Sequence, residues 1–129
     1  MRGFDHIDTW VFDLDNTLYP ASCRLFDQID KKMTGLVSEI LKIAPAEART
    51  IQKGLFHKYG TTLRGLMMEH EVDPIYFLRH AHDIDYAPVP ANLELDEALH
   101  ALPGRKLIFT NGTVAHAESV LKQLGVTRH

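Results

Sequence analysis

The stretch TWVFDLDNTLYP, residues 9–20, decides how this chain is expected to fold. Its first four residues form a short apolar run that is typical of a buried strand. Asp13 and Asp15 follow directly, and side chains two positions apart on an extended chain point the same way. Folding gains nothing from holding two like charges together at the mouth of a core. The pair therefore indicates chemistry and not only a polar strand end.

The chemistry follows from the properties of paired carboxylates. One carboxylate is a workable nucleophile toward phosphorus or an activated carbon, and its attack would form an acyl intermediate. A phosphate dianion would repel it, so a divalent cation has to bridge the two, and hard oxygen ligands favour magnesium. The second carboxylate can protonate the leaving oxygen and later deprotonate the water that hydrolyses the intermediate.

A second strand followed by a turn is expected in KLIFTNGT, residues 106–113. The apolar run 107–109 is too short for a helix and suits a strand buried on both faces. After the turn at Asn111 and Gly112, apolar residues recur with the spacing of a helix. The amides at the start of that helix, together with the Thr110 hydroxyl, form a natural anion site.

Both stretches resemble motifs of the haloacid dehalogenase superfamily of phosphatases. Residues 9–20 look like its first motif, and their NTLYP continuation resembles the branch of pyrimidine 5'-nucleotidases. KLIFTNGT looks like the second motif. The resemblance implies that Asp13 is the nucleophile and a magnesium ligand. It also implies that Asp15 is the general acid/base and lends its backbone carbonyl to the metal, and that Thr110 holds the transferred phosphoryl group.

The segment between the motifs shows helical periodicity, apart from a Pro-rich link over residues 87–91 that is expected to be extended. Its expected helix starts and stops are Ser22, Pro45, Gly60, Asp73 and Asn92.

An all-helical cap over residues 21–86 is therefore expected between two core segments, residues 1–20 and 87–129. Two strands joined through a helix form the right-handed unit of a doubly wound sheet. The expected fold class is α/β, with a Rossmann-like parallel sheet, incomplete here, and the inserted helical cap. Such a cap would close over the strand ends and exclude water.

The acid at Asp15 separates two reaction types. Members of the superfamily that attack carbon and release halide lack an acid at this position, so phosphoryl transfer to water is favoured over dehalogenation. We predict a magnesium-dependent phosphomonoester hydrolase that acts through an aspartyl-phosphate intermediate on pyrimidine nucleoside 5'-monophosphates. A sugar-phosphate phosphatase or mutase of the same superfamily and a truncated, non-catalytic remnant remain open.

The pattern departs from the superfamily downstream of Asn111. A lysine and one or two acidic magnesium ligands are expected there on further strands, but Lys122 and Glu118 belong to the helix directly after the turn. We expect the chain to be a fragment of a longer protein, in preference to a truncated product paired with another copy or a relic without activity. We also expect poor turnover by residues 1–129 alone and a homo-oligomer formed through the open sheet edge.

Composition excludes several other classes of function. The chain has 129 residues, a net charge of -3 and no cluster of Lys or Arg, so neither nucleic acid nor an anionic membrane is an expected partner. No apolar stretch approaches membrane-spanning length, and the profile of a signal peptide is absent. The single cysteine, Cys23, cannot form an intrachain disulfide. A cytoplasmic enzyme with a small phosphate ester as its partner is the resulting prediction.

The histidines give weaker signals. His80 and His82 lie in a run of potential metal ligands, but they diverge by roughly 200° on a helix, which favours a solvated helix end over a metal site. His116 lies in the first turn after Asn111 and could approach bound phosphate, although a structural role is favoured. The isolated histidines are interpreted as surface or snorkelling residues: His57, His70, His100 and His116.

Overall fold

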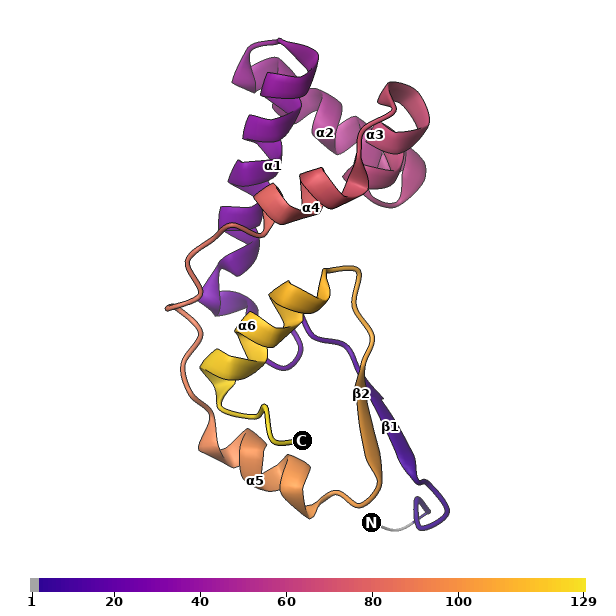
Figure 1. The fold of residues 1–129 in the computed structure, drawn as a ribbon, viewed down its shortest axis with the longest axis vertical. Helices are drawn as coiled ribbons and strands as arrows, with labels where there is room; N and C mark the ends of the chain where they lie inside the picture. Colours follow the sequence, from indigo (N-terminus) through magenta and orange to yellow (C-terminus); the bar gives the residue numbers. More distant parts are fainter. Residues whose placement is uncertain (1–2) are drawn as a thin grey trace. The chain divides into compact units, whose positions relative to one another are not determined.

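A computed structural model describes residues 3–129, which form two compact units (Figure 1). The first comprises the chain up to Arg24 together with Tyr86–His129, and we call it the strand unit. The second, Leu25–Asp85, is made of helices, and we call it the helical unit. Each unit has its own set of buried side chains.

Two short parallel strands form the sheet of the strand unit. Strand β1 spans Thr9–Phe12 and strand β2 spans Arg105–Ile108, paired in register from the first residue to the last. Beyond the pair, the Phe109 N–H donates to the Phe12 carbonyl at 2.9 Å. Because parallel strands end at the same edge, Asp13 and Phe109 leave the sheet side by side.

The entry into β2 depends on a glycine. Gly104 has a φ of +97°, and a Cβ at this position would lie 2.3 Å from the carbonyl oxygen of Asp8. The neighbouring Pro103 carbonyl accepts a hydrogen bond of 2.7 Å from the Trp10 indole N–H. Only glycine combines this backbone conformation with so close an approach to β1.

Two capped helices complete the strand unit, and both lie on the same side of the strand pair (Figure 1). Helix α5, Leu93–Ala101, begins at Asn92, whose side chain accepts from the Leu95 N–H. Helix α6, Val114–Leu124, begins at Thr113, whose hydroxyl accepts from the backbone N–H of the third helical residue. It ends at Gly125 in the left-handed conformation.

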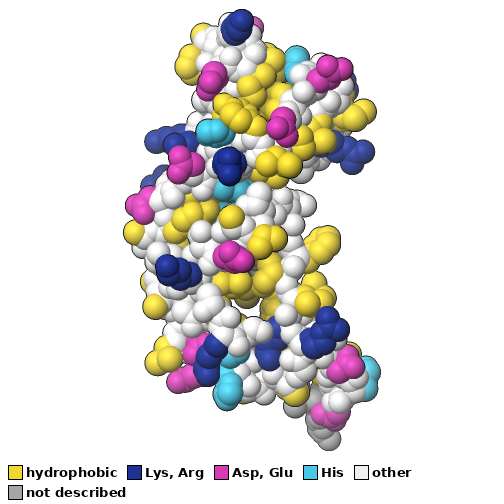
Figure 2. All heavy atoms as spheres, in the orientation of Figure 1, with side chains coloured by type: hydrophobic (Ala, Val, Ile, Leu, Met, Phe, Trp, Pro, Cys, Tyr) yellow, Lys and Arg dark blue, Asp and Glu magenta, His cyan; other side chains and the backbone are white. Residues whose placement is uncertain are grey.

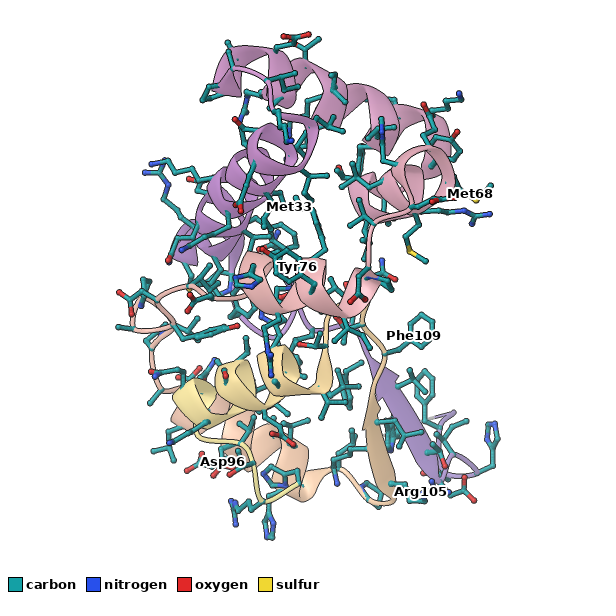
Figure 3. The ribbon with its side chains drawn as sticks, turned by 45° about the horizontal axis from the view of Figure 1, so that its top comes forward. Met33, Met68, Tyr76, Asp96, Arg105 and Phe109 are labelled. Atoms are coloured by element: carbon teal, nitrogen blue, oxygen red, sulfur yellow. The ribbon has the colours of Figure 1, made fainter. Side chains whose placement is uncertain are left out.

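The end of the chain is fastened to α5 through Asp96, which Figure 3 labels. Arg128 forms two hydrogen bonds with this carboxylate, of 3.0 and 2.8 Å, and His129 lies 2.7 Å from it. The guanidinium and the imidazole lower the pKa of Asp96 below its usual value.

The chain leaves the strand unit through a 3-10 turn, η1, at Ala21–Cys23. Arg24 then adopts the left-handed conformation with a φ of 58°, and helix α1 begins at Leu25. The prediction that Ser22 caps this helix is therefore wrong, because the left-handed residue separates the two helical segments.

The helical unit contains α1 (Leu25–Leu41), α2 (Pro45–Tyr59), α3 (Thr62–His70) and α4 (Pro74–Ala81). Its apolar core consists of Leu36, Val37, Ala48, Leu55, Leu66, Phe77 and Ala81. Gln52, 1% exposed, is satisfied by Thr34 at 2.5 Å and by Asp30 at 2.8 Å. Hydrophobic side chains also reach the surface (Figure 2), including those of Met68 and Ile75.

The predicted doubly wound α/β core is wrong for this structure. Residues 3–129 contain six α-helices and a single sheet of two four-residue strands, so the fold is mostly helical. A doubly wound sheet carries helices on both faces, whereas here Val11, Leu107 and Phe109 are 63%, 42% and 75% exposed. Phe109 points away from α5 and α6 (Figure 3). The expectation that the second strand is buried on both faces fails for the same reason.

Within residues 3–129, no helix combines the length and the apolar character that crossing a bilayer requires.

Candidate functional site

The loop after β1 is shaped by one buried leucine and one left-handed asparagine. Leu14 is fully buried, and its carbonyl accepts from the Leu18 N–H at 3.0 Å. Asn16 has a φ of 58°, a conformation that asparagine tolerates better than most residues. Leu14 therefore anchors the loop in the unit, and the acidic residues on either side of it face different surroundings.

Asp13 is exposed and contacts its own loop. Its Oδ1 accepts from the Leu14 N–H at 3.0 Å, and its Oδ2 accepts from the Thr17 hydroxyl at 3.1 Å. These two hydrogen bonds fix the carboxylate at the end of β1 while leaving it open to solvent. The Asp13 carboxylate is therefore accessible from solvent.

Asp15 is held by side chains from three parts of the strand unit. The Tyr19 hydroxyl donates to its Oδ1 at 2.6 Å, and Nε2 of His116 lies 2.8 Å from the same oxygen. The Thr110 hydroxyl donates to its Oδ2 at 3.4 Å. The Asp15 side chain keeps 16% of its surface accessible. The structure thus brings together Asp15 and Thr110, two of the residues singled out from the sequence.

The turn after β2 presents the remaining candidate residues. The Gly112 N–H donates to the Thr110 hydroxyl oxygen at 3.1 Å, so this amide is already used within the turn. Asn111 is exposed at its tip. The three expected phosphate-binding residues therefore adjoin one another, with the Thr110 hydroxyl between Asp15 and the Gly112 amide.

The sequence singled out His116 as a residue that could approach phosphate, but it did not predict the contact of His116 with Asp15. His116 is 1% exposed, so its interpretation as a surface or snorkelling residue is wrong. Besides Asp15, its ring contacts the Tyr86 hydroxyl, 2.7 Å from Nδ1. The sequence did carry a signal, because Val120 and Leu124 follow at intervals of four and share the buried helix face.

Tyr19 is a hydrogen-bond donor that stays protonated. Its side chain is 1% exposed, and burial raises its pKa well above the usual value. The hydrogen bond to Asp15 and the negative charge of that carboxylate raise the pKa further. Tyr19 therefore donates to Asp15 throughout the neutral range.

An apolar cavity of about 400 Å³ opens beside Thr110. Glu118 is the only charged residue in its lining. The lining consists of Ile108, Phe109, Thr110, Gly112, Thr113, Val114, Ala117, Glu118 and Leu121.

Of the two carboxylates that are expected to bind magnesium, that of Asp13 fits this role. Residues 3–129 hold no group of three or more His, Cys, Asp or Glu side chains that could bind a metal ion. Asp13 nevertheless offers an exposed hard-oxygen ligand, and magnesium is often held by one or two carboxylates, substrate phosphate and water. The Asp15 carboxylate is surrounded by hydrogen-bond donors, which leaves its backbone carbonyl as the group to share with a metal.

The chain is similar to a protein of baker's yeast. Over 128 residues the chain is 27% identical to phosphate metabolism protein 8 of Saccharomyces cerevisiae. The match covers 91% of this chain and 40% of that protein, so the chain spans well under half of the relative's length. No protein-family model matches the chain.

Proposed function

We propose that this chain carries the catalytic carboxylates of a phosphomonoester hydrolase of the haloacid dehalogenase type. One observation carries the proposal. Asp15 and Thr110 are 95 positions apart in sequence, yet their side chains lie 3.4 Å apart, just beyond the ends of two adjacent parallel strands. The similarity to a protein whose name refers to phosphate metabolism supports the choice of phosphate as the reacting group.

The proposed reaction has two balanced steps. An Asp13 oxygen attacks phosphorus, the P–O bond to the leaving group breaks, and Asp15, having taken up a proton, gives it to the departing oxygen. Asp15 then removes a proton from water, which attacks phosphorus and breaks the P–O bond to Asp13. Inorganic phosphate leaves, and both aspartates return to their starting forms.

Substrate binding in this proposal relies on the turn after β2. Thr110 and the backbone amides at the start of α6 face the phosphoryl group, since a helix start favours an anion. The apolar cavity beside Thr110 supports an organic leaving group packed next to the phosphate. The preference for pyrimidine nucleotides rests on the resemblance of residues 16–20.

The proposed activity depends on positive charge that offsets the negative charges of Asp13 and the phosphate. Magnesium, when bound beside Asp13, supplies positive charge that offsets the repulsion between the carboxylate and a phosphate dianion. Lys122, the lysine that follows Thr110 in the sequence, is exposed in the last turn of α6. We therefore expect slow turnover, because preorganised positive charge is a large part of such catalysis.

Release of inorganic phosphate by the purified chain tests the proposal. With magnesium present, we expect slow hydrolysis of UMP and CMP, and slower hydrolysis of phosphosugars. Asp13→Asn removes the nucleophile and should abolish phosphate release. Asp5→Asn is the matched control, because it neutralises another exposed carboxylate near β1, and it should leave the rate unchanged.

Other outcomes separate the alternatives. Equal rates for the wild type and Asp13→Asn would contradict the proposal. Preferential hydrolysis of phosphosugars would point to a sugar-phosphate phosphatase instead. Binding of beryllofluoride without turnover of any ester would support a phosphate-binding remnant that no longer completes the reaction.

A further inference from the structure

A continuous chain of hydrogen bonds surrounds the Asp15 carboxylate. It runs from the Tyr86 hydroxyl to His116 Nδ1, from His116 Nε2 to Asp15 Oδ1, and from the same oxygen to the Tyr19 hydroxyl. The three distances are 2.7, 2.8 and 2.6 Å. We call these four residues the tyrosine–histidine network. All of them belong to the strand unit.

The directions of these hydrogen bonds follow from the chemistry of the groups. An ionised carboxylate only accepts hydrogen bonds, so His116 donates to Asp15 through Nε2–H. In a neutral imidazole the other nitrogen is then an acceptor, and Tyr86 donates its hydroxyl proton to Nδ1. The ring orientation is therefore fixed from both sides, and one orientation satisfies both partners.

Burial makes this geometry restrictive. The His116 side chain is 0% exposed and the Tyr19 residue is 1% exposed. A buried polar group that loses its partner is destabilised, so alternative rotamers of these side chains are disfavoured. Asp15, by contrast, keeps 16% of its side-chain surface accessible.

The network also joins the two places where the chain leaves and re-enters the strand unit. Tyr19 lies shortly before Arg24, the last residue of the unit's first segment, and Tyr86 is the first residue of its second segment. His116 lies in the first turn of α6 and connects Tyr86 to Asp15. One carboxylate is thus tied to both connecting segments and to the helix that follows β2.

We propose that His116 is a positioning residue that fixes the Asp15 carboxylate for proton transfer, with Tyr86 fixing the imidazole in turn. The inference rests on the proposed function, since it concerns the same carboxylate. It assigns a role to a residue for which the sequence favoured a structural role over an approach to phosphate. Displacement of a reacting group by about 1 Å can slow a reaction by about 100-fold, so a positioning contact has a measurable effect.

Two substitutions at His116 separate positioning from space filling. His116→Gln places an amide N–H close to the position of Nε2 and retains the donor to Asp15. His116→Asn places its amide near the position of Nδ1 and loses that donor. His100→Asn is the control, because His100 is exposed on α5 of the same unit. The measurements are kcat and KM for the preferred ester and the 13Cγ resonance of Asp15 in each variant.

We expect His116→Asn to lower kcat by about 10- to 100-fold with little change in KM, and to shift the Asp15 resonance. His116→Gln should retain most of kcat and a resonance close to that of the wild type. Equal kcat values and unshifted Asp15 resonances in both variants would overturn the inference. If His116→Asn does not fold, Tyr86→Phe, which frees the ring from its outer partner, should lower kcat and shift the resonance in the same direction. An unchanged Tyr86→Phe variant would then overturn the inference.

The resonance also keeps this inference distinct from the proposed function. If the wild type hydrolyses no ester, the proposed function fails, and the Asp15 resonance alone decides the positioning role. A shift in His116→Asn that His116→Gln prevents would still support it, and its absence would refute it.

Discussion

Asp13 and Asp15 are chemically identical side chains in different surroundings. Asp13 is exposed and accepts hydrogen bonds from its own loop, whereas Asp15 contacts side chains from a neighbouring strand end and a helix. Enzymes commonly assign different tasks to paired carboxylates in this way. The accessible Asp13 suits attack on a substrate, and the firmly held Asp15 suits proton transfer at a fixed place.

At the residue scale, Tyr19→Phe tests the hydrogen bond to Asp15 through the pH dependence of stability. The pKa of Tyr19 in the folded chain lies above its unfolded value near 10.0, so folding favours the protonated phenol. This contribution is complete below pH 10 and is lost as the pH rises toward the folded pKa. In the wild type, Tyr19 should lower the free energy of unfolding by about 1.4 kcal/mol per pH unit above pH 10.

Urea unfolding of both proteins between pH 7 and about pH 11 measures this difference. Tyr19→Phe should be less stable by about 1–2 kcal/mol at pH 7 and should lack the alkaline slope that Tyr19 contributes. Tyr76→Phe, at a position 43% exposed, is the control and should keep the wild-type slope. Parallel pH curves for the wild type and Tyr19→Phe would contradict the raised pKa.

Sequence reasoning found some residues of this site because they follow strand ends. Asp13 and Thr110 each come directly after an apolar run, and Asp15 lies two positions after Asp13. Such positions share an edge once the strands pair in parallel. The contact of His116 with Asp15 was not predicted, because a lone histidine on a helix gives no local signal of its partner. Its contact with Asp15 joins positions 101 residues apart, and only the folded chain creates it.

At the element scale, the turn into β2 depends on the absence of a side chain. Gly104→Ala would place a Cβ 2.3 Å from the Asp8 carbonyl oxygen and would also have to adopt a positive φ. Left-handed backbone alone destabilises a residue with a side chain by about 1–2 kcal/mol. We expect a loss of more than about 2 kcal/mol in the stability of the strand unit, measured as faster amide hydrogen exchange in β1 and β2. Unchanged exchange there would show that β1 moves aside without penalty.

Two glycines of the helical unit provide a matched pair of substitutions. In Gly65→Ala, on α3, the new Cβ would lie 2.8 Å from the Leu55 side chain, so we expect a loss of about 1–3 kcal/mol. In Gly54→Ala, on α2, nothing lies within 4 Å of the new Cβ, and the gain in helix propensity should stabilise the unit by up to about 1 kcal/mol. Thermal unfolding followed by circular dichroism measures both. Equal effects of the two substitutions would argue against close packing of α3 on α2.

Helix boundaries were predicted well where a side chain or a glycine fixes them locally. Asp73 and Asn92 cap their helices through their own side chains, as predicted, and Gly60 follows the end of α2. The prediction that Ser22 caps α1 failed because Arg24 interrupts the helix, and the sequence carries no signal for the positive φ of Arg24. The expected burial of the sheet failed more seriously, since an apolar run predicts a strand but not which of its faces other elements cover.

At the scale of the whole molecule, the two units differ in how fully their apolar surfaces are covered. The helical unit has a contiguous core to which all four of its helices contribute. Within residues 3–129 the sheet of the strand unit has two strands, so each strand has one edge without a neighbouring strand. Val11, Leu107 and Phe109 remain exposed on or beside it.

The uncovered sheet predicts that copies of this chain associate with one another. Two-stranded sheets are marginal on their own, and an unpaired edge with exposed apolar side chains is a template for another strand. We expect sedimentation to detect species heavier than one chain, in proportions that rise with protein concentration. Leu107→Lys introduces a charge on β2 at a position that is already 42% exposed, and it should shift the population toward the single chain. Ile75→Lys places the same charge on α4, where Ile75 is 77% exposed, and should leave the sedimentation profile unchanged. If the wild type sediments as a single chain at every concentration, the exposed sheet does not drive association. If Ile75→Lys dissociates the assembly and Leu107→Lys does not, the contact lies on the helical unit instead.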